Sequence, residues 1–293
     1  MPTGSFVGGV NRGRQAGMQR SRLQKKEKDH LSRWTVSDSV ELYGVERWSE
    51  GAFTINNTGN VTLRGYGSNP DIDLKSLVDE IRMRGLTPPV LIHFTDILHR
   101  RMDTMVSAFA KASKECSYEG SYRGVYPIKV NQHRHVLEDV VSLGRPLHWG
   151  LECGSKPELV LAIALHDDAE GVIICNGYKD REYVETALHA TQLGNKVFIV
   201  IEKLSELDLV LDMARRRDVE PLLGLRVKLS SRGKGLWESS GGDRSKFGLR
   251  SDEIVEAVKI LRRRKKLGLL QLLHWHLGSQ ICCLLYTSDA ADE

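Results

Sequence analysis

The sequence predicts an α/β fold: a parallel sheet whose strands alternate with helices, preceded by a short β-rich N-terminal segment. Seven short apolar runs follow one another between residues 90 and 274, and amphipathic segments lie between them. Residues that favour helix starts stand at the beginning of several of those segments. Strands that alternate with helices in this way are typical of parallel sheets, because each crossover returns the chain to the same edge.

The composition is that of an ordinary globular protein. Of the 293 residues, 41% are hydrophobic and 27% are charged, and no run approaches the roughly 20 apolar residues that span a bilayer. The formal net charge of +4 gives no support for a nucleic-acid partner. Five cysteines without CxxC spacing favour a reducing compartment over a disulfide scaffold. We therefore expect no nucleic acid and no membrane among the partners.

Residues 1–33 are expected to form a disordered basic leader. Residues 1–26 hold six Lys and Arg and no Asp or Glu, and they lack the apolar stretch of a secretory signal. Two interpretations stay open, an organelle transit peptide and a solvated leader. The expected location is therefore the cytoplasm or a plastid.

Residues 34–85 are expected to form the β-rich N-terminal segment. The β-prone pieces Phe53–Ile55 and Val61–Leu63 flank the turn-forming run Asn56–Asn60. An Asn- and Gly-rich connection between two such pieces predicts a β-hairpin.

The main domain is expected over residues 86–281. Its apolar runs are, in order, Val90–Phe94, Val125–Val130, Leu147–Leu151, Val172–Cys175, Val197–Ile201, Leu222–Val227 and Leu269–His274. About seven strands approach the eight strands and roughly 250 residues of a (β/α)8 barrel, so the barrel is incomplete by one strand. An open doubly wound sheet is the alternative, although no GxGxxG motif follows an early strand.

Three helix starts support the alternation of strands and helices. Ser155 with Glu158 matches a capping box, Asp180 precedes a helix pattern that stops at Gly194, and Ser251 opens another. The last of these helices ends in the basic cluster Arg262–Lys266. Cations in a last turn complement the helix dipole, so we interpret this cluster as a solvated face rather than a nucleic-acid patch.

Lys129 is the first candidate for chemistry. In the run Val125–Val130 the alternation of a strand places it on the face opposite Ile128 and Val130, directed into the core or a site. Burial lowers the pKa of an ammonium group, and a neutral amine is what Schiff-base formation requires. The alternative is an edge-strand lysine that points to water, which Pro127 favours slightly.

The second candidate is the segment that follows the last apolar run. His274 and His276 share a strand face, but no third metal ligand at suitable spacing is evident, so we expect no metal there. Gly278 and Ser279 suit a turn whose N–H groups and hydroxyl bind a phosphate.

Two weaker candidates remain. The Gly-rich passage Ser230–Leu249 follows a strand and precedes a helix, as a ligand-facing loop or as a flexible connection. Glu152, at a strand end beside Cys153, is a candidate for orienting a cofactor, with ordinary strand-end polarity as the alternative.

Five motifs in order resemble one enzyme family. They are Tyr126–Gln132 (YPIKVNQ), Gly150–Lys156 (GLECGSK), Cys175–Tyr183 (CNGYKDREY), Ser245–Leu249 (SKFGL) and His276–Gln280 (HLGSQ). Together they resemble biosynthetic arginine decarboxylase, a pyridoxal-phosphate enzyme of the alanine-racemase-like barrel type. Trp34–Val45 and Tyr66–Ser68 resemble the plant-type members in particular. The resemblance runs from about residue 34 to Ile281.

The resemblance implies roles for individual residues. Lys129 matches the lysine that binds pyridoxal 5′-phosphate covalently, His276 the histidine that stacks on its ring, and Ser279 a residue that helps to bind its phosphate. Glu152 and Arg226 fall where the family places polar groups near the cofactor. Lys129 and His276 are the expected catalytic residues.

The resemblance also implies an activity and partners. The expected reaction is the conversion of L-arginine to agmatine and CO2, the first step of polyamine biosynthesis, carried out by a homodimer or a higher homo-oligomer. The resemblance alone allows Mg2+ as a second cofactor. Another basic-amino-acid or diaminopimelate decarboxylase is an alternative, and so is a non-catalytic homologue that regulates a full-length partner.

The tail departs from the family pattern. Residues 282–293 match nothing that follows Ile281 in the family, whose members continue for several hundred residues. We therefore expect a truncated chain with a foreign tail. Because an unfinished barrel leaves strand edges and apolar faces uncovered, we expect it to be poorly soluble and inactive alone.

Overall fold

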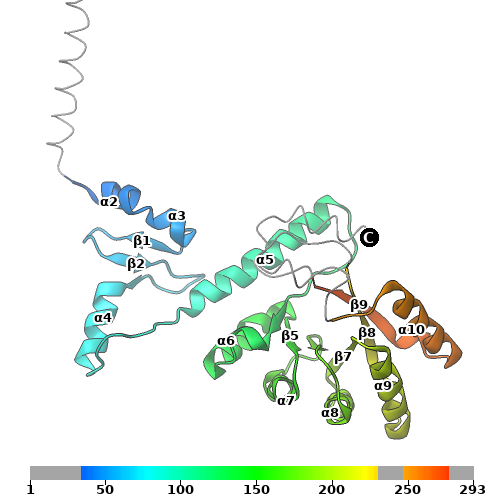
Figure 1. The fold of residues 1–293 in the computed structure, drawn as a ribbon. Coiled ribbons are helices and arrows are strands. Elements are labelled where there is room, and N and C mark those ends of the chain that lie inside the picture. Colours follow the sequence, from blue (N-terminus) through cyan, green and yellow to red (C-terminus); the bar gives the residue numbers. More distant parts are fainter. Residues whose placement is uncertain (1–33, 230–246, 277–293) are drawn as a thin grey trace, which may run out of the picture. The chain divides into compact units, whose positions relative to one another are not determined.

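The structure is a computed structural model that describes residues 34–229 and 247–276 (Figure 1). It divides into two compact units, Met1–Ile97 and Leu98–Glu293. The predicted leader 1–33, the tail 282–293 and most of the loop Ser230–Leu249 lie outside the described residues. None of the helices in the described ranges has the length and apolar character needed to span a bilayer.

The N-terminal unit contains a small antiparallel sheet. Strands β1 (Phe53–Ile55), β2 (Val61–Leu63) and β3 (Ile72–Asp73) pair in the order β1-β2-β3, after helices α2 (Val36–Tyr43) and α3 (Val45–Ser49) and before α4 (Leu74–Met83). The hairpin predicted around Asn56–Asn60 is confirmed, with Phe53 opposite Leu63.

Side-chain amides and a carboxylate hold the turn of this hairpin. Asn56 and Asn60 donate to Asp73 Oδ2 over 2.7 and 2.9 Å, and Asp73 also caps α4 through the N–H groups of Lys75 and Ser76. These bonds lower the pKa of Asp73, with the bond from Asn60 as the largest cause. The polar turn residues thus fix the register of the hairpin.

The second unit is a six-stranded parallel sheet in the sequential order β4 to β9. Its strands are β4 (Val125–Pro127), β5 (Gly150–Cys153), β6 (Val172–Cys175), β7 (Lys196–Ile201), β8 (Leu222–Val227) and β9 (Leu270–Trp275). Every neighbouring pair of these strands is parallel. Sequential order with parallel pairing is the strand arrangement of a (β/α)8 barrel.

Helices cover one face of this sheet (Figure 1). They are α6 (Arg134–Gly144), α7 (Lys156–Leu165), α8 (Arg181–Gln192), α9 (Leu204–Arg217) and α10 (Ser251–Arg263), and α5 (Thr95–Glu115) precedes β4. The main core lies between these helices and the strands and includes Leu159, Ile173 and Leu188, all fully buried. A smaller apolar cluster, with Val172, Ile174 and Val200 as its buried members, lies on the other face.

Six of the seven predicted strands are present, and the prediction of the first one is wrong. Val90–Phe94 forms no strand, and its side chains are exposed or only partly buried, with Leu91 81% exposed. An apolar run becomes a strand only where a neighbouring strand satisfies its backbone groups, and the described residues offer none there. The strand predicted at Leu147–Leu151 starts later, at Gly150, after a 3-10 turn over Arg145–Leu147.

The predicted helix starts are confirmed, with one difference in detail. Asp180 caps α8 by accepting from the N–H of Tyr183 over 2.9 Å. Ser155 stands at the N-cap of α7 but makes no capping bond; Glu158 instead accepts from the N–H of Gly154 over 2.8 Å. The predicted reciprocal bonds of a capping box are therefore absent, and Glu158 binds the residue before the N-cap instead.

The basic cluster at the end of α10 is exposed, as predicted, and it also forms salt bridges that the sequence did not predict. Arg264 contacts Asp208 and Asp212 over 2.6 and 2.9 Å, and Lys266 contacts Glu220 over 2.7 Å. These acidic groups belong to α9 and the loop after it, so the cluster ties two neighbouring helices together.

Two adjacent residues of α7 test where the core lies. Leu159 is fully buried and Val160 is 57% exposed. We expect Leu159→Ala to lower the free energy of unfolding by about 2–5 kcal/mol, because it leaves a cavity. Val160→Ala, the matched control, should change it by less than about 0.5 kcal/mol. Urea unfolding followed by circular dichroism measures both, and equal effects would contradict the described packing.

Candidate functional site

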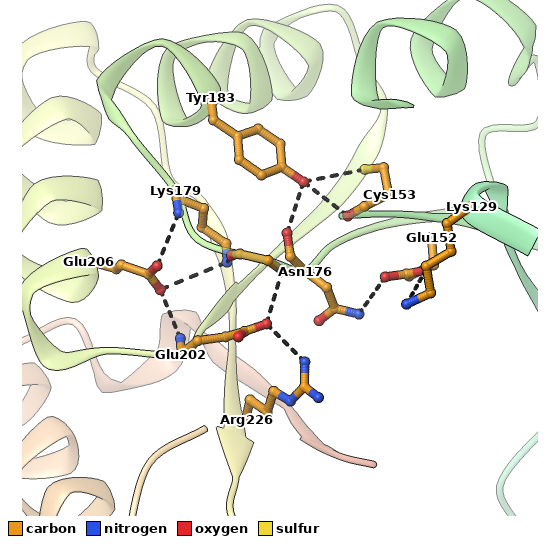
Figure 2. Close-up of polar contacts among 10 residues, drawn as sticks. Lys129, Glu152, Cys153, Asn176, Lys179, Tyr183, Glu202, Glu206 and Arg226 are labelled. Carbon is orange, nitrogen blue, oxygen red and sulfur yellow. Dashed lines mark hydrogen bonds and ion pairs between the residues drawn. The ribbon is translucent and has the colours of Figure 1, made fainter. Parts of the chain in front are cut away.

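Polar side chains gather where the strands of the parallel sheet end (Figure 2). We call this group the carboxyl edge; its members are Lys129, Glu152, Asn176, Glu202, Arg226, His274 and His276, from the ends of β4 to β9 or the residues just after them. The ends of parallel strands meet at one edge, which is where sites form in barrels and open α/β sheets.

Lys129 does not lie on a strand, which corrects the prediction from alternation. The last register pair of β4 is Pro127 with Glu152, and the chain then turns through the 3-10 segment Ile128–Val130. In that turn Ile128 is fully buried, whereas the Lys129 side chain is 64% exposed. The amine is therefore accessible from solvent, and the prediction that it is buried is wrong.

Glu152 brings a buried carboxylate to this amine. Its Oε2 lies 3.8 Å from Nζ of Lys129, and its Oε1 accepts from Asn176 Nδ2 over 3.1 Å. The side chain is only 10% exposed, and Oε2 has no hydrogen-bond partner among the described residues. A buried carboxylate oxygen without a donor is costly, so it is poised to accept a bond from a bound group.

Asn176 is a site residue that the sequence reasoning missed. It follows the buried strand β6 directly and links Glu152 to the end of that strand. The Tyr183 hydroxyl lies 2.9 Å from the carbonyl of Cys153 and 3.1 Å from the carbonyl of Asn176, so it ties β5 to β6. Burial raises the pKa of Tyr183, which keeps its hydroxyl a donor. A polar residue just after an apolar strand was the available signal.

Arg226 is held by a second carboxylate that the sequence reasoning also missed. Its Nη1 donates over 3.0 Å to Oε1 of Glu202, whose side chain is completely buried. The same oxygen accepts from the N–H of Gly177 over 2.9 Å. Glu202 comes directly after β7, again the position just beyond an apolar run.

Gly177 permits the close approach of two neighbouring loops. Its φ of +75° favours glycine, and a Cβ there would come within 2.3 Å of the carbonyl oxygen of Gly154. The N–H of Gly177 can therefore reach Glu202 only while residue 177 has no side chain.

His274, on β9, is half-buried, and His276, the residue after the end of that strand, is more exposed. Burial lowers the pKa of His274 to about 4, and the charge of Arg226, its register partner on β8, adds to the effect. Burial also lowers the pKa of His276, with the charges of Arg226 and Lys129 as further causes. Both imidazoles are therefore neutral at pH 7. The structure thus brings His276, Lys129 and Arg226 together, whereas Ser279 lies outside the described residues.

No group of three or more His, Cys, Asp or Glu side chains within residues 34–229 and 247–276 is arranged to hold a metal ion. The chemistry that these residues offer is that of an accessible primary amine beside buried carboxylates, a guanidinium and neutral imidazoles.

Comparison with known proteins identifies the second unit. The family described as "Pyridoxal-dependent decarboxylase, pyridoxal binding domain" matches residues 101–291. The biosynthetic arginine decarboxylase of Gloeobacter violaceus is 51% identical over 262 residues, which is 89% of this chain and 40% of that protein. The chain therefore spans about 40% of the length of this curated relative.

Solved structures agree on the fold. The biosynthetic arginine decarboxylase of Campylobacter jejuni superposes with a TM-score of 0.75 at 36% identity, covering 85% of this chain and 39% of that one. A diaminopimelate decarboxylase from M. jannaschii superposes with a TM-score of 0.62 at 19% identity, covering 84% and 53%. The predicted α/β fold with an incomplete barrel is confirmed.

His274 makes stability depend on pH. Because its pKa is lower in the folded chain than in the unfolded one, the unfolded state binds more protons between pH 6.5 and about 4. Stability therefore falls as the pH falls through that window. We expect the free energy of unfolding of the wild type, relative to His274→Gln, to drop by about 1–3 kcal/mol from pH 6.5 to pH 4.

Urea unfolding at a series of pH values measures this difference. The exposed His133 supplies the control variant, His133→Gln. A relative stability of wild type and His274→Gln that stays constant over the window would contradict the burial of His274.

Proposed function

The chain belongs to the pyridoxal-dependent decarboxylases, and from that premise we propose that it is the cofactor-binding part of a biosynthetic arginine decarboxylase. Its reaction would convert L-arginine to agmatine and CO2. The observation that carries the proposal is the 51% identity to an arginine decarboxylase over 89% of this chain, with Lys129 at the carboxyl edge of the matching domain.

The residues at the carboxyl edge fit pyridoxal phosphate. An aldehyde needs an accessible primary amine, and Lys129 provides one. The buried oxygens Glu152 Oε2, Asn176 Oδ1 and Glu202 Oε2 have no hydrogen-bond partner among the described residues, so they can accept bonds from a bound group. We propose that Lys129, Glu152, Arg226 and His276 hold the ring, and that Ser279 helps to hold the phosphate.

The chemistry that pyridoxal phosphate supplies when bound is an electron-withdrawing ring that accommodates the electron pair left behind when the carboxylate departs as CO2. The chain supplies proton control and orientation. Glu152 Oε2, 3.8 Å from Nζ of Lys129, is placed to accept a proton from this amine. His276 is neutral, so it can lie against an aromatic ring without bringing a further positive charge.

The same proposal covers location and assembly. Cys153 and Cys175 are buried free thiols whose sulfur atoms lie 3.8 Å apart. The hydrogen bond between them raises the pKa of Cys153, and burial raises it further. Because free buried thiols are typical of reducing compartments, we propose the cytoplasm or a plastid as the location. We propose a homodimer or higher homo-oligomer as the working assembly.

Reductive labelling tests the role of Lys129. We expect borohydride treatment of the chain with pyridoxal phosphate to attach the cofactor to Lys129, detected by peptide mass spectrometry. Lys259 is the matched control, since the side chains of Lys129 and Lys259 are both 64% exposed. Labelling of Lys259 to the same extent would show that exposure alone directs the reaction and would refute the site.

A chimera tests the substrate class. Residues 34–276 replace the matching segment of the Gloeobacter violaceus enzyme, and CO2 release is followed with arginine, ornithine and diaminopimelate. We expect release from arginine, and a loss of at least about 1,000-fold in kcat in the chimera with Lys129→Ala, because covalent catalysis depends on this amine.

Circular dichroism and cofactor absorbance report whether the chimera is folded and loaded. A folded, loaded chimera that leaves arginine unchanged would overturn the proposal. Preference for diaminopimelate or ornithine would support a different decarboxylase.

A further inference from the structure

Behind the carboxyl edge lies a buried ion pair that the proposed reaction does not use (Figure 2). The side chains of Lys179 and Glu206 are 1% and 5% exposed, and Nζ lies 3.8 Å from Oε2. Lys179 also donates to the carbonyl of Gly177. Burial lowers the pKa of Lys179, and the carboxylates of Glu206 and Glu202 oppose that change. The charge balance inside the fold therefore depends on both partners.

Glu206 joins two loops through their backbones. It stands in the first turn of α9 and accepts from the N–H of Lys179 over 3.0 Å and from the N–H of Glu202 over 2.8 Å. Lys179 belongs to the loop after β6 and Glu202 to the loop after β7. Each carboxylate oxygen serves a different N–H, so a glutamine in its place, with one acceptor oxygen, could satisfy only one of them.

Glu202 passes this constraint on to Arg226. Its backbone N–H is fixed by Glu206, and its Oε1 binds both the N–H of Gly177 and Nη1 of Arg226. Glu202 therefore cannot shift without moving Arg226.

Arg226 in turn acts on the histidines. It pairs in register with His274 across β8 and β9, and its charge disfavours protonation of His274 and His276. The other charged groups at the carboxyl edge are Lys129, Glu152 and Glu202, from the ends of three further strands.

We propose that Lys179 and Glu206 are positioning residues: they fix Glu202, which fixes the Arg226 guanidinium beside His274 and His276. The consequence is that the guanidinium charge stays where it disfavours protonation of both imidazoles, in addition to the effect of burial. The inference rests on the proposed function only where pyridoxal phosphate is used as a probe.

The first experiment needs no cofactor. Histidine C2–H resonances of the 293-residue chain, assigned with His274→Gln and His276→Gln, are titrated in the wild type, Glu206→Gln, Lys179→Met and the double variant. When Arg226 is no longer held by Glu202, the effect of its charge on the pKa of His274 is lost. The smaller, opposing effect of the Glu202 charge is lost with it. We therefore expect both midpoints to rise toward the ordinary value of 6.5.

Glu253 provides a matched control. It stands at the same position of α10 as Glu206 does of α9, three residues after the N-cap, and it accepts from the N–H of Arg250 over 2.9 Å. Glu253→Gln removes a comparable helix-start carboxylate away from the carboxyl edge. We expect it to leave both histidine midpoints unchanged.

The double variant separates positioning from mere stabilisation. Each single variant leaves one buried charge without its partner, which strongly destabilises a fold, whereas Glu206→Gln with Lys179→Met leaves none. We therefore expect the double variant to recover stability in urea relative to the single variants while the raised histidine midpoints persist. If the double variant recovered its stability and its histidine midpoints also returned to the wild-type values, the pair would be only structural.

A second experiment uses pyridoxal phosphate as the probe. We expect Kd in the double variant to be weakened about tenfold at pH 7.5, the loss typical of a charge-assisted bond. As the solution is acidified, the Kd for pyridoxal phosphate should begin to rise at a higher pH in the double variant than in the wild type. The reason is that His276 becomes protonated at a higher pH in the variant. A merely looser fold would weaken binding at every pH without moving that onset.

Three outcomes decide the matter. Histidine midpoints equal to those of the wild type in a folded double variant would overturn the inference. Raised midpoints with a shifted onset of acid loss would support it. If the wild-type chain fails to bind pyridoxal phosphate at Lys129, the proposed function fails, and the cofactor-free titration still decides the role of Lys179 and Glu206.

Discussion

Parallel register is the constraint on which the site depends. Pro127 pairs with Glu152, Cys153 with Cys175, and Arg226 with His274, so the strands of the second unit end within a short distance of one another. A charged or amide residue placed just after each buried run is thereby brought into one group, although the residues are up to 147 positions apart (Lys129 to His276). The apolar strands decide where the polar groups meet, since hydrophobic burial fixes the register.

Burial of so many polar groups is tolerated because nearly every charge has a counterpart. Lys179 faces Glu206, Arg226 faces Glu202, and Lys129 faces Glu152. An isolated charge in such a place would cost several kcal/mol, whereas a paired and hydrogen-bonded one costs far less. Among the described residues, the buried side-chain oxygens without a hydrogen-bond partner lie on Glu152, Asn176 and Glu202, all at the carboxyl edge. The described residues thus concentrate these unsatisfied oxygens where a ligand can bind.

Sequence patterns gave six strands, the hairpin and the helix starts, because alternation and capping residues are local signals. They failed for Val90–Phe94, where pairing was absent, and for Lys129, where the strand ends at Pro127, three residues early, and a turn exposes the side chain. Lys129, Glu152, Arg226 and His276 could be picked out through motifs and resemblance. Asn176 and Glu202 were signalled only by their positions just after apolar strands, and Glu206 by nothing local, because the roles of all three come from contacts between segments that are 24 to 27 residues apart.

The absence of a side chain at Gly177 also limits how this loop can change in evolution. Because a side chain there would strike Gly154, and because the same N–H serves Glu202, a single codon change at 177 would disturb three strand ends at once. Tolerated replacements would have to arrive together with compensating changes in the Gly154 loop. Because the clash is with backbone atoms that any residue at 154 would carry, relatives that keep this loop geometry should keep glycine at position 177.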